Sequence, residues 1–351
     1  MRSKENKTRA VVIGSFGHWS CVLDEIAGLD GVEVVAVAAA MSGESVAGIV
    51  AHNASSKDIA VFEDYRAMLK KTHPDVVVVS CRLDLIPKIA MDAARAGCDI
   101  ICEKPLALDV STLQKFHQVV SENGVRLMAM LSTRADPVFQ TARRLFQQGA
   151  IGEVVVVNAR KSYKYGDRPD WFGARQMYGG TMLWVGIHAL DMIHFTTGQT
   201  FTSVAAMQRN FAHPQRPDCE DCVIALLGLD NGGAATISVD LLRPEAAATH
   251  GDDWIRLVGT LGIIEARSND GVVRLLKDTA HATTIACDPV RPLYRPFLLR
   301  EISDDELLGT EDPFLLTHAC LCAREAADAG VVEQIPALPW LRATTIQAGV
   351  P

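Results

Sequence analysis

Short apolar runs alternate with longer amphipathic segments from residue 9 to about residue 131. The segments between the runs repeat apolar residues at helical spacing, and glycines at 97 and 124 follow two of them as helix-ending residues. This alternation predicts right-handed βαβ units and a parallel sheet covered by helices on both faces. The expected strands are residues 9–13, 32–39, 76–80, 99–102 and 125–131, and the expected helices are 20–27, 64–71, 84–96 and 110–122.

The pattern changes after about residue 135. One helical segment at 138–148 is followed by longer strand-like runs, and the turn signals Asn231-Gly-Gly and Asn269-Asp-Gly predict hairpins between several of them. We therefore expect two domains, 1–131 and 132–351, the second built on a large, mostly antiparallel open sheet. Its expected strands are 153–162, 202–210, 222–229, 234–242, 254–259 and 262–267, with further helices at 181–197 and 313–329.

Composition narrows the class of protein. The 351 residues are 48% hydrophobic and 22% charged, with a net charge of −8, so nothing in the total charge favours nucleic acid or an anionic membrane. No apolar run approaches the roughly 20 residues of a membrane span, and no secretory apolar region follows the charged N-terminus. Nine scattered cysteines indicate reduced thiols in a cytoplasmic protein.

The turn after the first strand is a candidate phosphate site, because the first βα turn of a parallel sheet presents backbone N–H groups to ligands. It reads Gly14-Ser15-Phe16-Gly17-His18-Trp19, with Phe16 and Trp19 where a dinucleotide fingerprint has glycines. A glycine-containing turn of any α/β protein is the alternative interpretation. The second strand ends in alanines, so neither an acidic ribose reader nor an arginine for a 2′-phosphate stands there; Glu44 could bend back, which leaves NAD and NADP open.

Two later segments carry candidate chemistry. Glu103-Lys104-Pro105 directly follows the strand expected at 99–102, where a lysine would face the crevice for a nicotinamide; a solvated surface lysine is the alternative. Gly179-Gly180 opens a helix on which His188 and Asp191, three residues apart, share a face. A histidine satisfied within the core is the alternative interpretation there.

In this order and spacing, these segments resemble the Gfo/Idh/MocA family of oxidoreductases. The resemblance implies an N-terminal Rossmann domain with a doubly wound parallel sheet, and a C-terminal α/β domain whose open sheet forms a substrate cleft and often an oligomer interface. It implies NAD or NADP as cofactor, with NAD slightly preferred, and a sugar- or polyol-like substrate. Lys104 matches the family lysine that hydrogen-bonds the reacting oxygen, and His188 matches the general acid–base. Asp191 would orient the histidine, contact substrate, or have a structural role in its helix.

Further contacts follow from the same resemblance and from the loop before the glycine pair, where an ordinary charged surface loop is the alternative. The expected cofactor contacts are Gly14, Ser15, Phe16, Gly17, His18, Ala39, Ser80, Cys81, Arg82, Glu103 and Lys104. The expected substrate contacts are Lys161, Tyr163, Trp171, Arg175, Trp184 and His188, with Lys161 or Arg175 as the partner of an anionic group.

One departure from the family keeps alternatives open. Relatives that resemble inositol dehydrogenase carry an aspartate four residues before the histidine, and here Trp184 occupies that position. Two alternatives to the oxidoreductase therefore remain: a non-catalytic dinucleotide or sugar sensor, and an NAD-dependent glycoside hydrolase or lyase with transient oxidation.

Cys219 and Cys222 have the spacing of half a zinc site without a second pair, so no metal is predicted. A homo-oligomer, dimer or tetramer, is expected by resemblance.

Overall fold

The computed structural model describes residues 7–52, 59–277, 280–301 and 309–341. The chain divides into two compact units: unit 1 comprises Met1–Met130 and Pro292–Phe314, and unit 2 comprises Leu131–Arg291 and Leu315–Pro351. The sequence predicted domains over 1–131 and 132–351. In the structure the chain passes into unit 2 at Leu131, and residues 292–314 belong to unit 1.

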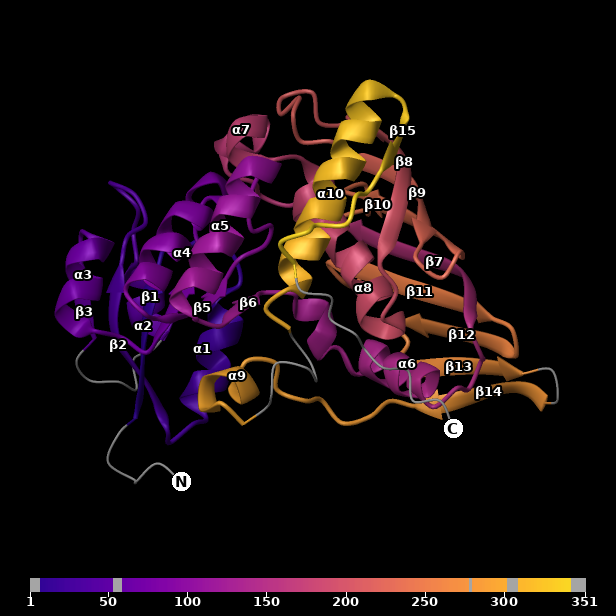
Figure 1. Cartoon of the computed structure of the whole chain (residues 1–351), viewed down its shortest axis with the longest axis horizontal. Coiled ribbons are helices and arrows are strands. Elements are labelled where there is room, and N and C mark those ends of the chain that lie inside the picture. The colour runs from indigo at the N-terminus through magenta and orange to yellow at the C-terminus, as the bar shows by residue number, and fades with distance from the viewer. Residues whose placement is uncertain (1–6, 53–58, 278–279, 302–308, 342–351) are drawn as a thin grey trace. The chain divides into compact units, whose positions relative to one another are not determined.

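Unit 1 is a parallel six-stranded sheet in the order β3-β2-β1-β4-β5-β6, which is the order of a dinucleotide-binding Rossmann fold (Figure 1). Residues of β1 and β4 are almost all fully buried, as continuous apolar runs predict for strands covered on both faces. The strands are β1 (Thr8–Ile13), β2 (Val32–Ala38), β3 (Ala60–Phe62), β4 (Val76–Val79), β5 (Asp99–Cys102) and β6 (Leu127–Ala129). The helices are α1 (Trp19–Ala27), α2 (Ala47–His52), α3 (Tyr65–Thr72), α4 (Ile86–Arg95), α5 (Val110–Asn123) and α9 (Arg295–Leu299), with a 3₁₀ turn η1 (Leu83–Leu85).

The Glu25 carboxylate attaches the returning segment to α1. Glu25 accepts hydrogen bonds from the backbone N–H groups of Leu293, Tyr294 and Arg295, each at 2.8 Å. These donors lie at the beginning of α9, where a helix leaves its first N–H groups without intrahelical partners. A side chain more than 260 residues earlier in the chain therefore caps α9, and no local pattern near residue 293 announces this contact.

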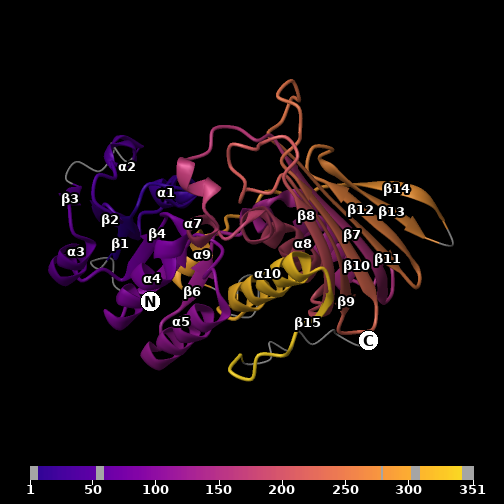
Figure 2. The ribbon, with the colours of Figure 1, turned by 90° about the horizontal axis from the view of Figure 1, so that it is seen from above.

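Unit 2 is a nine-stranded sheet in the order β14-β13-β12-β11-β7-β10-β9-β8-β15, in which β7 and β10 pair in parallel and the other neighbours are antiparallel (Figure 2). The two predicted hairpins are confirmed as β9–β10 and β12–β13. The strands are β7 (Val154–Tyr163), β8 (Phe201–Arg209), β9 (Cys222–Leu229), β10 (Ala234–Asp240), β11 (Gly251–Gly259), β12 (Gly262–Arg267), β13 (Val272–Lys277), β14 (Ala280–Ala286) and β15 (Val332–Gln334). The helices are α6 (Pro137–Gln147), α7 (Arg175–Tyr178), α8 (Ile187–Thr197) and α10 (Asp312–Ala329), with 3₁₀ turns η2 (Ser132–Ala135) and η3 (Asp170–Gly173) and a π-helical turn η4 (Met182–Gly186).

The two faces of this sheet differ in burial. Helices α6 and α8 pack against one face, where Ala159, Ile255 and Leu257 are at most 3% exposed. Alternate residues point to the opposite face, and there Met207 and Ile224 lie side by side, 81% and 55% exposed. Among the helices that the structure describes, none is both long and apolar enough to cross a membrane.

Candidate functional site

The turn after β1 packs directly on the end of β4. Phe16 donates its N–H to the Ser80 carbonyl at 2.9 Å, and the Ser80 hydroxyl donates to the Phe16 carbonyl at 2.7 Å. Gly14 has a φ of +85°, and a Cβ there would lie 2.5 Å from the same Ser80 carbonyl oxygen. Glycine is therefore required at position 14 for both conformation and space.

Glu103 closes the other end of this turn. Its fully buried carboxylate accepts the backbone N–H of His18, and the His18 Nδ1 lies 2.7 Å from the same oxygen. A Cβ at Gly17 would overlap that oxygen, which explains the second glycine. Burial acts to raise the pKa of Glu103, but the His18 ring and the neighbouring Lys104 charge outweigh burial and lower the pKa. Glu103 is thus a buried carboxylate that orders the turn.

Lys104 follows Glu103 at the carboxyl end of β5 and is only 1% exposed. This burial excludes the solvated surface lysine considered above. The lysine backbone N–H is 3.3 Å from the Glu103 Oε2 atom, and the peptide to Pro105 is cis. A buried ammonium at the ligand-binding edge of a Rossmann sheet is the strongest chemical feature of unit 1.

The remaining expected cofactor contacts stand at the same strand ends but differ in environment. Cys81 is buried, and burial raises the pKa of its thiol well above the usual range. Arg82 forms a two-pronged ion pair with Asp84 at 2.6 and 2.9 Å, so its charge is already compensated. Ala39 directly follows β2 and is partly exposed. The structure therefore joins the first turn to Ser80 and Glu103, and places Ala39 and Arg82 outside that contact.

The residues of unit 1 fit a dinucleotide. Gly14 and Gly17 give the turn its positive-φ geometry, and the nine-residue helix α1 begins directly after it, so that the end of the helix that favours a phosphate follows the turn. Trp19 occupies the position of the third glycine, and its side chain packs on neighbouring residues of unit 1. Its Nε1 donates to the Ser15 carbonyl at 3.1 Å, and its ring contacts the His52 ring edge-on. Gly14, Gly17 and the N-terminus of α1 would hold the pyrophosphate.

His188 is carried by α8 in unit 2. Its imidazole is 3% exposed, and its Nδ1 lies 3.5 Å from the Thr133 hydroxyl of η2. The expected single helix over 181–197 is in fact a π-helical turn, η4, followed by α8. The π turn, a feature often found at functional sites, contains Trp184 and widens the helix between Trp184 and His188.

The glycine pair before this helix is explained by Glu220. Gly180 has a φ of +105°, and a Cβ there would lie 3.2 Å from the Glu220 carboxylate, which accepts the N–H of Thr181 at 2.9 Å. The adjacent Asp221 is fully buried and accepts backbone N–H groups of Phe211 and Ala212. The acidic pair between Cys219 and Cys222 therefore holds a loop and a helix start.

Asp191 contacts a buried arginine. Arg134 lies 2.6 Å from Asp191 by its Nη2 and 2.8 Å by its Nε, and both side chains are at most 2% exposed. The Arg134 guanidinium also lies over the Phe195 ring, 5.4 Å from the centroid. Of the three roles expected for Asp191, this ion pair supports the structural one.

Aromatic side chains gather before the helix. Trp171 and Tyr178 both contact Phe172, with ring centroids at 4.4 and 4.3 Å, and Trp184 meets Phe172 edge-on at 6.1 Å. Trp171 and Trp184 are half-buried, so each ring retains exposed surface. The structure thus brings these two expected substrate contacts together around one phenylalanine.

Both cations expected to bind an anionic substrate group are already paired. Buried Lys161 donates to Asp253, and its Nζ lies 5.0 Å from the Tyr163 ring centroid. Burial acts to lower the pKa of Lys161, but Tyr163 and Asp253 outweigh it and raise the pKa. Arg175 pairs with Glu220 at 2.5 Å and with Asp328 at 2.8 Å.

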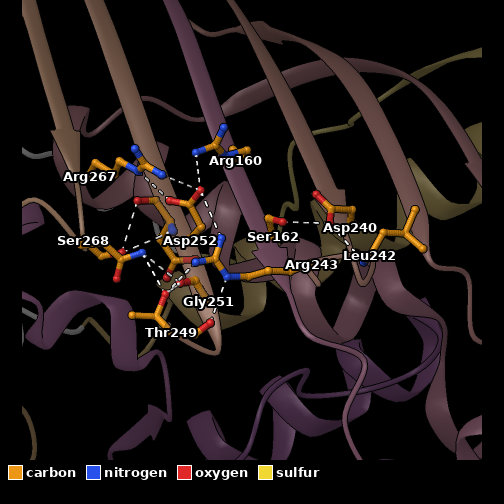
Figure 3. A network of polar contacts seen from close by, with 12 residues as sticks. Arg160, Ser162, Asp240, Leu242, Arg243, Thr249, Gly251, Asp252, Arg267 and Ser268 are labelled. Carbon is orange, nitrogen blue, oxygen red and sulfur yellow. Dashed lines mark hydrogen bonds and ion pairs between the residues drawn. The ribbon is translucent and has the colours of Figure 1, made fainter. Parts of the chain in front are cut away.

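Asp253 was not anticipated, since residues 250–254 have the composition of a turn, yet β11 already begins at Gly251. The strand alternation sends the neighbouring Asp252 to the opposite face. There Asp252 joins Arg160 at 2.8 Å, Arg267 at 2.7 Å and Arg243 at 3.5 Å (Figure 3). Two adjacent aspartates therefore neutralise cations on the two faces of one sheet.

Comparisons with known proteins agree with this architecture. Residues 8–131 match the model of an oxidoreductase family with an NAD-binding Rossmann fold, and residues 139–265 match the Gfo/Idh/MocA C-terminal domain. Inositol 2-dehydrogenase of Rhizobium meliloti is 30% identical over 197 residues, which cover 55% of this chain and 57% of that protein.

Solved structures extend the likeness to nearly the whole chain. A proposed oxidoreductase from Thermotoga maritima is 34% identical, with a TM-score of 0.86 over 93% of this chain and 99% of its own. Levoglucosan dehydrogenase, solved with NADH, is 18% identical and shares the fold, with a TM-score of 0.79 over 95% of this chain and 100% of its own.

Proposed function

Because the chain belongs to the Gfo/Idh/MocA family of oxidoreductases, we propose that it oxidises or reduces a secondary hydroxyl or carbonyl of a sugar- or polyol-like substrate with NAD or NADP. The observation that carries this proposal is Lys104, a buried ammonium at the carboxyl end of β5 in a Rossmann sheet. The bound nicotinamide supplies the acceptor or donor of hydride.

Lys104 stabilises the oxygen of the reacting carbon. During oxidation that oxygen gains negative charge, and an ammonium removed from water acts on it more strongly than a solvated one. Glu103 lies beside Lys104 in the chain and is committed to the first turn through His18. The buried Glu103 carboxylate, which also lies 3.3 Å from the Lys104 backbone N–H, therefore helps to fix Lys104 at the end of β5.

His188 moves the hydroxyl proton. An imidazole titrates near neutrality, so it can accept the proton during oxidation and return it during reduction. The Thr133 hydroxyl lies at Nδ1, which leads us to assign the proton transfer to Nε2. Asp191 lies about one turn after His188 on α8 and pairs with Arg134 of η2. In this scheme Asp191 is therefore a positioning residue.

The paired cations favour a substrate without a carboxylate or phosphate. Lys161 and Arg175 are compensated by Asp253, Glu220 and Asp328, so neither brings an uncompensated positive charge. The half-buried faces of Trp171 and Trp184 suit the C–H face of a sugar ring. Two of the similar proteins, inositol 2-dehydrogenase and levoglucosan dehydrogenase, are named after neutral polyhydroxylated substrates.

We also propose that the chain pairs with a second copy through the exposed face of its nine-stranded sheet. Met207, Ile224 and Leu226 are 81%, 55% and 55% exposed and are cross-strand neighbours on β8 and β9. Sedimentation should give a dimer or tetramer for the native chain. Ile224→Lys should shift it toward the monomer, and a monomeric native chain would contradict this part.

Activity is tested with Lys104→Met and His188→Ala, assayed by absorbance of the reduced cofactor on a panel of inositols, anhydrosugars and aldoses. Each variant should lower turnover by about 10²–10⁴-fold without loss of folding. Lys88→Met and His281→Ala, both at exposed positions, are the matched controls and should retain turnover. Native rates from both site variants would contradict these roles. Cofactor binding without turnover would indicate a sensor, and product without reduced cofactor would indicate a hydrolase or lyase.

A further inference from the structure

We propose that Glu44 selects NAD over NADP, an inference that rests on the proposed function. The usual acidic ribose reader ends the second strand of a Rossmann sheet, but β2 is followed here by Ala39 and Ala40. Glu44 comes four residues later, in the loop between β2 and α2. The structure turns its side chain back toward the strand ends.

Three donors hold the Glu44 carboxylate there. Its Oε1 accepts the backbone N–H of Ser15 at 2.7 Å and the Ser15 hydroxyl at 3.0 Å, and its Oε2 accepts the backbone N–H of Ala40 at 2.7 Å. Ser15 belongs to the turn after β1, and Ala40 follows β2, which is the neighbouring strand in the sheet. The carboxylate thus bridges the carboxyl ends of two adjacent strands, beside the candidate phosphate turn.

This placement supplies the chemistry that the sequence of β2 lacks. A carboxylate has about four acceptor positions, and the three donors above leave Oε2 able to accept one more. Glu44 is partly exposed, so a ligand hydroxyl can reach it. A ribose 2′-hydroxyl is the donor that such a carboxylate accepts in a Rossmann fold. Because both oxygens are anchored to the backbone, little ordering is needed on binding.

The same carboxylate disfavours NADP. A 2′-phosphate would bring a second negative group against Glu44, and the chain contains no Lys or Arg from Ala39 to His52 to neutralise it. Arg82, the arginine among the expected cofactor contacts, is paired with Asp84. Juxtaposed like charges cost several kcal/mol, so we expect NADPH to bind about 100-fold more weakly than NADH.

The competing explanation is that Glu44 only stabilises the two loops. A structural role predicts that its loss weakens both dinucleotides by the same factor, whereas a ribose reader predicts a change in their ratio. The ratio of the two dissociation constants therefore separates the explanations, and it does not depend on turnover.

The experiment is calorimetric titration of the full chain with NADH and NADPH, for the native protein, Glu44→Gln and Asp24→Asn. Asp24 is an exposed acid of the same unit that pairs with His52, so its variant removes the same charge away from the strand ends. Glu44→Gln should reduce the NADH preference at least tenfold, and Asp24→Asn should leave it unchanged.

Three results would overturn the assignment. Equal native affinities for the two dinucleotides, or equal weakening of both by Glu44→Gln, would remove Glu44 as the selector and leave the proposed function intact. Binding of neither dinucleotide by the native chain would overturn the proposed function and the selector together. Should Glu44→Gln fail to fold by circular dichroism, Glu44→Asp, which draws the carboxylate back by one methylene, takes its place. An unchanged ratio of the two dissociation constants in Glu44→Asp would then remove Glu44 as the selector.

Discussion

Replacement of Asp191 by alanine should destabilise unit 2 strongly, because it would remove the carboxylate that pairs with the buried Arg134 guanidinium. Both side chains are at most 2% exposed, and the two contacts are 2.6 and 2.8 Å long. Removal of one partner of such a buried pair costs about 3–5 kcal/mol. For a unit of this size, the loss corresponds to a fall in melting temperature of about 6–20 °C.

Tryptophan fluorescence during urea unfolding measures the free energy of unfolding of unit 2. Four of the five tryptophans, at 171, 184, 254 and 340, belong to unit 2, and only Trp19 belongs to unit 1. The matched control is Asp270→Ala, which removes an aspartate of unit 2 whose arginine partner Arg274 is 3.9 Å away and 62% exposed. That exposed pair should contribute less than about 1 kcal/mol.

A second comparison separates charge compensation from other roles of Asp191. The double variant Arg134→Met/Asp191→Leu removes both charges and keeps similar volume, so it should recover most of the lost stability. Asp191→Ala with native stability would refute the structural interpretation. A stable Asp191→Ala protein with greatly reduced turnover would instead return Asp191 to the catalytic group.

Three other substitutions test separate parts of the structure. Gly14→Ala should cost about 2–4 kcal/mol in urea unfolding, because the methyl group meets the Ser80 carbonyl, whereas Gly97→Ala, with a similar φ and open space, should cost only about 1–2 kcal/mol. Glu25→Ala should speed hydrogen exchange at the amides of residues 293–295 and leave exchange in β4 unchanged; unaltered protection would show that the carboxylate does not hold α9. Arg267 and its neighbours outweigh burial and lower the pKa of Asp252, so this group stabilises the fold above pH about 4 and loses that effect as the pH falls further. Asp252→Asn should therefore lose less stability than the native chain between pH 7 and pH 3, and equal losses would contradict the sign.

The sequence predicts unit 1 well where burial is continuous. Runs such as 76–79 are apolar at every position because both faces of the parallel sheet are covered, and the structure confirms the strand. Strands β13, β14 and β15, at the two edges of the second sheet, were not among the expected strands, because polar residues such as Arg274, Thr284 and Glu333 interrupt their apolar pattern. The fold class was therefore predictable, but the edges of the second sheet were not.

The sequence pointed to candidate site residues only where they belong to a local motif of recognisable spacing. Lys104 and His188 stand next to glycines, prolines and strand ends that form recognisable spacings. Glu44 was considered only as a residue that could bend back, and Asp253 was not expected at all, because side chains that reach back or cross to a neighbouring strand leave no regular spacing in the sequence. The pairing of Lys161 and Arg175 with acids likewise became visible only with the tertiary fold.

The return of residues 292–314 to unit 1 sets an order of events during synthesis. When residue 130 has left the ribosome, all six strands of the first sheet exist, but the amides that Glu25 accepts and the Phe314 ring that meets Phe116 do not. Strands β7 to β14 of unit 2 are made before them. Unit 1 therefore lacks its last segment throughout the synthesis of most of unit 2, although all the strands of its sheet have been made. A gene fragment ended at residue 131 would keep it permanently in that state.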